Sequence, residues 1–144
     1  MTGLRSRSLA PLVLLSLAAL SCGSHQLKSV TLQPSSADAK NFTNGQVQFT
    51  AKGTFSDSST PVTLTSKDVT WCIGEMTNVA NPTAGVCIGN VSPFAVVDQN
   101  GLAQCTNAPV QGTGYILAGK ATPPMNPDGG AQMTVFGSAT LTCP

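Results

Sequence analysis

The sequence predicts an all-β sandwich, and three observations support this prediction. From Ser29 onward, short runs with apolar residues at alternate positions are separated by clusters of Gly, Pro, Asn and Asp. Charged residues make up only 9% of the 144 residues and hydrophobic residues 41%, which excludes a disordered polyelectrolyte and a helical bundle rich in Glu and Lys. After residue 22, no run keeps the helical period of about 3.6 residues. The length suits one domain.

Residues 1–21 have the organisation of a bacterial export signal. Arg5 and Arg7 precede an apolar stretch, Leu9 to Leu20, that is too short for a membrane span. The run Ala18-Ala19-Leu20-Ser21-Cys22 resembles the lipobox of bacterial lipoproteins. This resemblance implies that the signal is removed and that Cys22 becomes a diacylated N-terminus anchored in a membrane. Ordinary secretion, with Cys22 as a spare thiol, is the alternative.

The cysteine count supports lipidation. The chain has five Cys, and removing Cys22 from the count leaves four, which can pair. Two or three acyl chains would make the membrane attachment stable. Residues 22–28 then form a short tether to a domain over 29–144. The only histidine, His25, lies in this tether, and we expect it to be solvated rather than catalytic or metal-binding.

The N-terminal half of the domain contains three apolar alternations. Val30 and Leu32 alternate with polar neighbours before Pro34. The turn signal Asn44-Gly45 comes next, and the strand after it places on one face Val47, Phe49, Ala51 and Phe55. The third run places on one face Val69, Trp71 and Ile73.

The C-terminal half continues the alternation. Ala95 and Val97 precede a turn at 98–101, and Ala103 and Cys105 follow it. The last two strands have inward faces made of Gly114, Ile116 and Ala118, and of Met133, Val135, Ala139, Leu141 and Cys143. The same alternation turns Tyr115 and Phe136 outward. The expected core therefore contains Val47, Phe49, Trp71, Val97, Ile116 and Leu141.

Three stretches resemble the bacterial immunoglobulin-like domain, group 2. They are Ser29 to Pro34 (SVTLQP), Asp68 to Trp71 (DVTW) and Ala95 to Ala103 (AVVDQNGLA), which are similar to the family's first strand, third strand and D–E hairpin. The resemblance covers about 29–143 and implies an immunoglobulin-like antiparallel sandwich of two sheets and about seven strands. Such domains serve in surface proteins as spacers or adhesion modules, without catalytic residues. A long insert at 74–92, a longer 121–130 loop and four cysteines depart from the family pattern.

The cysteines are assigned by strand parity within this topology. Cys72 follows the inward Trp71, so we expect it to point outward and to staple the insert through a Cys72–Cys87 bridge. Cys105 and Cys143 continue inward faces and arrive at the same end of the sandwich on opposite sheets, which predicts a Cys105–Cys143 bridge. A metal site is the competing interpretation, but no CxxC motif or nearby histidine supports it. We expect no metal and no cofactor.

The sequence contains no catalytic motif. Three of the six acidic residues, Asp57, Asp98 and Asp128, lie in turn-like clusters where Asp caps backbone amides. A Ser or Cys nucleophile would need a histidine partner, and the only histidine is in the tether. We therefore expect no enzymatic activity. Once the signal is removed, the chain has no Arg and five Lys against six acids, which argues against a nucleic-acid partner.

Strand direction suggests which end faces outward. The first strand begins on the same side as the loops at 56–66, 98–101 and 121–130, so the anchor is expected there. The opposite end would carry the 74–92 insert and the 106–112 loop, and we expect a protein or glycan partner at these two segments. The expected function is a non-enzymatic, lipid-anchored module of the bacterial cell envelope, in the outer membrane or at the cell surface, with an adhesive, surface-structural or recognition role. A soluble, secreted carbohydrate-binding module is the alternative.

Overall fold

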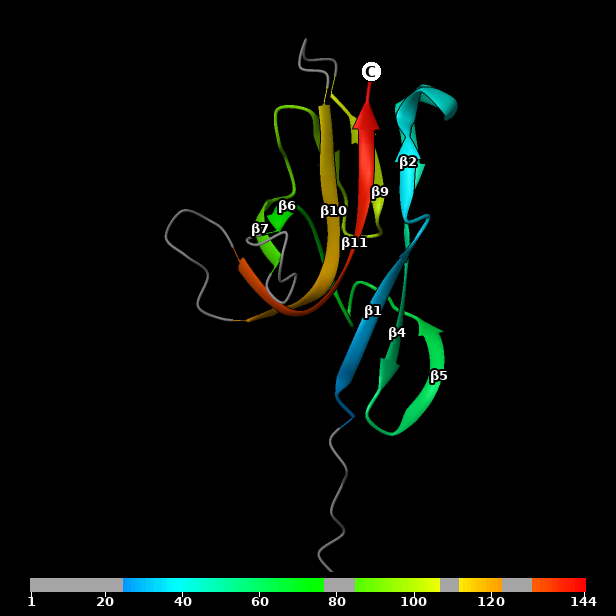
Figure 1. The fold of residues 1–144 in the computed structure, drawn as a ribbon, viewed down its shortest axis with the longest axis vertical. Coiled ribbons are helices and arrows are strands. Elements are labelled where there is room, and N and C mark those ends of the chain that lie inside the picture. Colours follow the sequence, from blue (N-terminus) through cyan, green and yellow to red (C-terminus); the bar gives the residue numbers. More distant parts are fainter. Residues whose placement is uncertain (1–24, 77–84, 107–111, 123–130) are drawn as a thin grey trace, which may run out of the picture.

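The computed structural model describes residues 25–76, 85–106, 112–122 and 131–144. Strands dominate this part of the chain, and its helical elements are two single turns, η1 (Ala39–Asn41) and η2 (Thr43–Gly45). The strands form two layers around a common core (Figure 1). The predicted all-β sandwich is therefore confirmed.

The first layer is built around a strand that is interrupted only at Phe49. Its strands are β1 (Leu27–Gln33), β3 (Gln46–Gln48), β4 (Thr50–Phe55), β5 (Ser58–Thr63), β8 (Ala95–Val97) and β9 (Leu102–Cys105). β4 lies between β1 and β5, and β3 pairs with β9, which pairs with β8. Because β3 runs into β4, the two three-stranded sheets join into one layer.

The second layer contains a long hairpin of two strands. Its strands are β2 (Ser36–Asp38), β6 (Thr70–Met76), β7 (Gly85–Gly89), β10 (Gly112–Thr122) and β11 (Ala131–Cys143). β10 pairs with β6 on one side and β11 on the other. In the strand letters of immunoglobulin-like sandwiches, β1, the β3–β4 strand, β9 and β8 correspond to A, B, E and D. In the second layer, β11, β10, β6 and β7 correspond to G, F, C and C′. One pairing departs from the antiparallel expectation, because β2 runs parallel to β11.

The core between the layers matches the sequence prediction. All six expected core residues are buried, namely Val47, Phe49, Trp71, Val97, Ile116 and Leu141. The Trp71 side chain crosses to the β8–β9 turn and packs against Gly101, which has a φ of 81°. Asp98 holds this turn, since its carboxylate accepts hydrogen bonds from the amides of Asn100 and Leu102, both at 2.8 Å. The turn and the indole therefore fix each other.

A β-bulge at Thr134 changes the face on which the start of β11 lies. Lys120 pairs with Val135, but the next residue, Ala121, pairs with Met133, so Thr134 is an extra residue. An extra residue reverses the alternation of side chains beyond it. Met133 therefore leaves the face that holds Val135, and its predicted place in the main core is wrong.

The reversed residues belong to a second, smaller core. β7 pairs with β6 and also with Ala131–Met133 of β11, so the second layer closes on itself. The buried residues enclosed by this closure are Cys72, Cys87, Leu117, Ala131 and Met133. Cys72 was predicted to point outward. It does lie outside the core that holds Trp71, but it is fully buried because β7 and the start of β11 cover it. Phe136, also predicted outward, is half-buried against the same cluster.

The structure also corrects the expected position of the insert. Part of the 74–92 segment is not a loop, because Gly85–Gly89 is strand β7. Gly85 pairs with Met76 on β6 and with Met133 on β11. The residues that flank 77–84 therefore lie beside the strand that begins after 123–130. The 74–92 insert and the 121–130 loop were expected at opposite ends of the sandwich, and that expectation is wrong because their described flanking residues pair with one another.

Candidate functional site

The sandwich has two distinct ends. The first described residues, next to β1 and the β4–β5 turn, lie at one end, and the C-terminus lies at the other (Figure 1). We call the first the near end, comprising residues 25–28 and 54–59. We call the second the far end, comprising residues 38–45, 105–106, 112–113 and 142–144.

A disulfide ties the two layers together at the far end. Cys105 at the end of β9 is bonded to Cys143 at the end of β11, with a Cα–Cα distance of 5.7 Å. Cys143 is buried, and Cys105 is half-buried. This is the pair that strand parity predicted. The second bridge, Cys72–Cys87, also has a Cα–Cα distance of 5.7 Å and lies in the second core.

Two adjoining hollows lie beside this bridge. One has a volume of about 370 Å³, and its lining includes Asp38, Lys40, Thr113, Thr142 and Pro144. The other has a volume of about 440 Å³ and is lined by Ala39, Lys40, Phe42, Asn44, Gly45, Cys105, Thr106 and Pro144. Lys40 and Pro144 line both, so the hollows form one continuous recessed surface.

Lys40 and Asp38 supply a charged pair to this surface. The Lys40 ammonium lies 2.8 Å from the Asp38 carboxylate, which also accepts a hydrogen bond from the Lys40 amide at 3.1 Å. The side-chain hydrogen bond lowers the pKa of Asp38 and raises that of Lys40. Both groups therefore stay ionised at neutral pH, and neither is poised to transfer a proton.

Phe42 is the exposed aromatic residue of the far end. It lies between η1 and η2, and 42% of its surface is exposed. An aromatic ring beside a charged pair and two hollows suits recognition of a partner, because aromatic anchors contribute strongly to interfaces. Neither Phe42 nor the Asp38–Lys40 pair was predicted from the sequence as part of a site. The apolar Phe42, two residues before the Asn44-Gly45 turn, was a signal that could have indicated them.

Tyr115 presents a second exposed aromatic ring, on the outer face of β10. It is 38% exposed, as strand parity predicted. Its partner on β11 is Thr140, and the neighbouring pair, Thr113 and Thr142, has hydroxyl oxygens 3.1 Å apart. This face therefore combines one aromatic ring with a row of hydroxyl groups.

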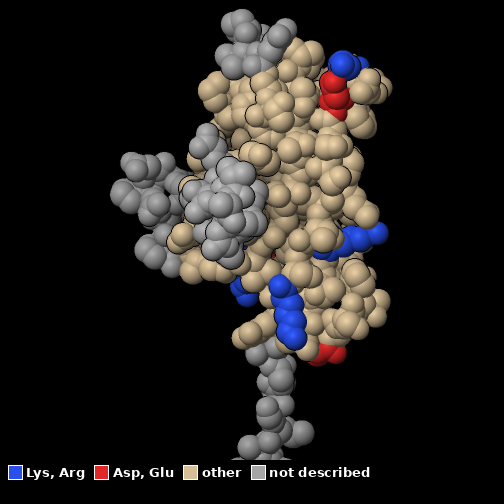
Figure 2. All heavy atoms as spheres, viewed as in Figure 1, with Lys and Arg blue, Asp and Glu red and all other residues tan. Residues whose placement is uncertain are grey.

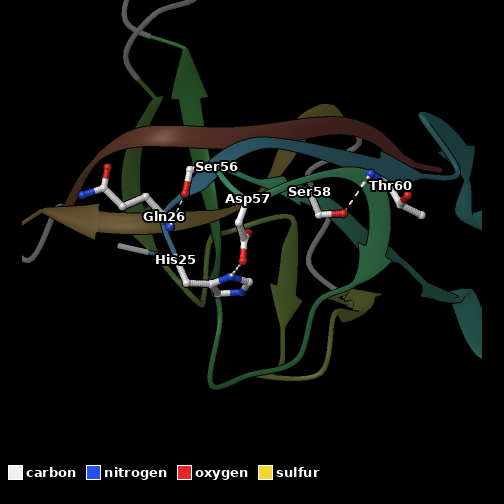
Figure 3. Close-up of polar contacts among 6 residues, drawn as sticks. All are labelled: His25, Gln26, Ser56, Asp57, Ser58 and Thr60. Carbon is white, nitrogen blue, oxygen red and sulfur yellow. Dashed lines mark hydrogen bonds and ion pairs between the residues drawn. The ribbon is translucent and has the colours of Figure 1, made fainter. Parts of the chain in front are cut away.

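His25 at the near end is not a free tether residue. The Nδ1 atom of its ring lies 2.8 Å from the Asp57 carboxylate (Figure 3). The ring also stacks on Phe55, with a centroid distance of 3.9 Å and an interplanar angle of 14°. The Ser56 amide donates to the Gln26 carbonyl at 2.8 Å. The hydrogen bond from His25 lowers the pKa of Asp57. Thirty-two residues separate His25 from Asp57, and no local sequence signal indicated this contact.

The remaining sequence predictions concern a metal site, a membrane attachment, and partner loops that lie partly outside the described residues. Within 25–76, 85–106, 112–122 and 131–144, no three His, Cys, Asp or Glu side chains form a group that could hold a metal ion. The same segments contain no helix that is long and apolar enough to cross a membrane. The predicted lipidation residue, Cys22, lies outside the described residues. So do 77–84 and 107–111, which belong to the two predicted partner loops.

No family model matches the chain, and no curated protein matches its sequence. The functional evidence is therefore the geometry itself. Two disulfides indicate an oxidising, extracytoplasmic environment, because cytosolic thiols are kept reduced.

Proposed function

We propose that this protein is a non-enzymatic, lipid-anchored module of the bacterial cell envelope that recognises a partner with its far end. The domain is an immunoglobulin-like sandwich similar to the group 2 bacterial family, preceded by a lipoprotein signal. The anchor is Cys22, and the binding surface is the recessed area around Phe42, Lys40 and Pro144.

One observation supports this proposal above the others. The described chain begins at one end of the sandwich, and its C-terminus lies at the other (Figure 1). Pro144 at this C-terminus lines both hollows, one of which Phe42 also lines, and the Cys105–Cys143 bridge adjoins them. A domain held by Cys22 would therefore expose the far end to the surroundings. The bridge would keep that surface rigid, and a preorganised surface loses less entropy on binding.

The anchor is tested by metabolic labelling with an alkyne palmitate analogue. Wild-type protein should carry the label and sediment with membranes, because Cys22 accepts the acyl chains. The Cys22→Ser variant should carry no label and should appear in the soluble fraction. Labelling that persists in this variant would contradict the assignment of Cys22.

The far-end surface is tested by photo-cross-linking in intact envelopes. A benzoylphenylalanine residue at Phe42 should give a discrete cross-linked species. The same residue at Val62, which is 46% exposed on β5, is the matched control and should give none. Equal cross-linking at both positions, or none at Phe42, would contradict a binding role for the far end.

A soluble, secreted carbohydrate-binding module is the second candidate, and exposed Tyr115 among threonine hydroxyls favours it. Sugar rings stack on aromatic faces while their hydroxyls bond to neighbouring polar groups. A glycan-array signal that is lost in Tyr115→Ala and kept in Phe42→Ala would support this alternative. No signal for the wild-type protein would count against it.

A further inference from the structure

The lysines of the described chain are distributed unevenly between its two ends. Lys40 is paired with Asp38 at the far end. The other four, Lys28, Lys52, Lys67 and Lys120, have no carboxylate within 4 Å among the residues that the structure describes. Figure 2 shows most of the visible lysine side chains over the part of the molecule built from β1, β4 and the lower part of β10. We call these four residues the lysine collar.

Each member of the lysine collar reaches solvent on the half of the sandwich that includes the near end. Lys28 lies on β1 and Lys52 on β4, and Lys120 lies near the end of β10 that is remote from Cys143. Lys67 lies just before β6, whose first residue, Thr70, pairs with Gly119 next to Lys120. Lys52 is half-buried, and the other three are exposed.

The described aspartates outside the far end are held by hydrogen bonds within the chain. Asp57 is bonded to His25. Asp68 accepts hydrogen bonds from the Thr65 amide and hydroxyl, both at 2.8 Å, and Asp98 accepts from its own turn. Among the described residues this half therefore carries four lysines against these three aspartates, and its ammonium groups, unlike its carboxylates, are not held by an ion pair or side-chain hydrogen bond, so the external ion that suits them is an anion.

The contacts of His25 determine how far this half can lie from a lipid anchor. Because His25 is held by Phe55 and Asp57, the folded part begins there, three residues after Cys22. At about 3.3–3.6 Å per residue, this length spans at most about 11 Å. The Debye length at physiological ionic strength is about 8 Å. His25 and the near end, which includes Lys28, would thus remain close to the range of the charged headgroups.

We propose that the lysine collar docks on the anionic phospholipid headgroups of the membrane that holds Cys22, so that the far end points away from it. The proposal rests on the lipid anchor proposed above. Each lysine near an anionic bilayer surface favours binding of the protein to that surface by about fivefold. Tethering makes docking intramolecular, so a few such contacts are enough to favour one orientation.

The test is lysine footprinting of the full-length, lipidated protein, purified from membranes and reconstituted in nanodiscs. One set contains phosphatidylcholine alone. The other contains about 40% phosphatidylglycerol, which gives the disc surface the negative potential that attracts lysines. Acetylation rates are followed by mass spectrometry. All four collar lysines should react at least threefold more slowly in the anionic discs, and 1 M salt should abolish the difference, as screening requires. Lys40 is the internal control and should react equally in both.

Two variants make the test specific. In the Lys28→Gln, Lys52→Gln double variant, Lys67 and Lys120 should lose most of their protection, whereas Lys40→Gln should leave it unchanged. Tryptophan fluorescence checks that each variant is folded. Collar reactivity that is the same in both discs, or protection of Lys40, would overturn the proposed orientation alone. An intact mass without acyl chains would overturn the anchor and this proposal with it.

Discussion

The packing of Trp71 against the β8–β9 turn can be tested by two glycine substitutions that share one backbone effect. Gly45 and Gly101 both have a positive φ, 65° and 81°. An added Cβ at Gly45 would meet no atom within 4 Å. At Gly101 it would lie 2.7 Å from the Trp71 ring and 2.7 Å from the Phe49 carbonyl oxygen. The pair therefore separates backbone strain from crowding of the core.

The expected free-energy losses follow from these contacts. Gly45→Ala should cost about 1 kcal/mol, since a left-handed conformation costs an L-residue about 1–2 kcal/mol and the loss of unfolded-state entropy offsets part of it. Gly101→Ala should cost a further amount of about 1–3 kcal/mol, because atoms of a packed core must move. In a domain of this size, each 1 kcal/mol lowers the melting temperature by about 4 °C.

Urea denaturation followed by fluorescence measures both free-energy losses, since Trp71 is the only tryptophan. In thermal unfolding followed by the same signal, the melting temperature should fall by about 4 °C in Gly45→Ala and by about 8–16 °C in Gly101→Ala. An equal loss in both variants would mean that the turn does not pack on the indole. The assignment of Trp71 to the centre of the sandwich would then fail.

Three further outcomes are expected. Replacing Cys105 and Cys143 by Ala should lower the free energy of unfolding in urea by about 4 kcal/mol, because the bridge closes a 38-residue separation, and a loss below about 1 kcal/mol would contradict this. His25→Ala should raise the pKa of Asp57 toward its ordinary value in a carboxyl NMR titration. That pKa is lowered in the folded protein, so the contribution of the pair to stability is present above the ordinary Asp pKa and is lost as pH falls through the folded value. Met133→Ala should cost about 2–5 kcal/mol in thermal unfolding, whereas a solvent-facing residue would cost under about 0.5 kcal/mol.

The main core could be predicted from the sequence because it follows strand alternation over uninterrupted strands. Val47 and Phe49 keep the same face, and so do Trp71 and Ile73. Period-2 alternation is a local property, and a buried face specifies it strongly. The same rule identified Cys105 and Cys143 as neighbours once their strands were assigned to opposite layers.

The contacts of the two ends could not be predicted in this way. His25 and Asp57 are 32 residues apart, and the sequence near each resembles an ordinary polar turn or tether. The far-end hollows depend on how η1 and η2 lie against the ends of β9 and β11. Short irregular segments take their conformation from tertiary contacts, so neither periodicity nor spacing indicates their place.

The second core changes the interpretation of the Cys72–Cys87 bridge. Parity made it a surface staple for the 74–92 insert, which gave that insert its status as a binding loop. Alternation remains valid along β6, but the bulge at Thr134 and the closure of β7 onto β11 bury the outward face on which Cys72 lies. The bridge therefore joins two strands inside an apolar cluster, and it no longer marks a surface. The Cys105–Cys143 bridge adjoins the exposed hollows instead, and this is why the proposed binding surface lies at the far end.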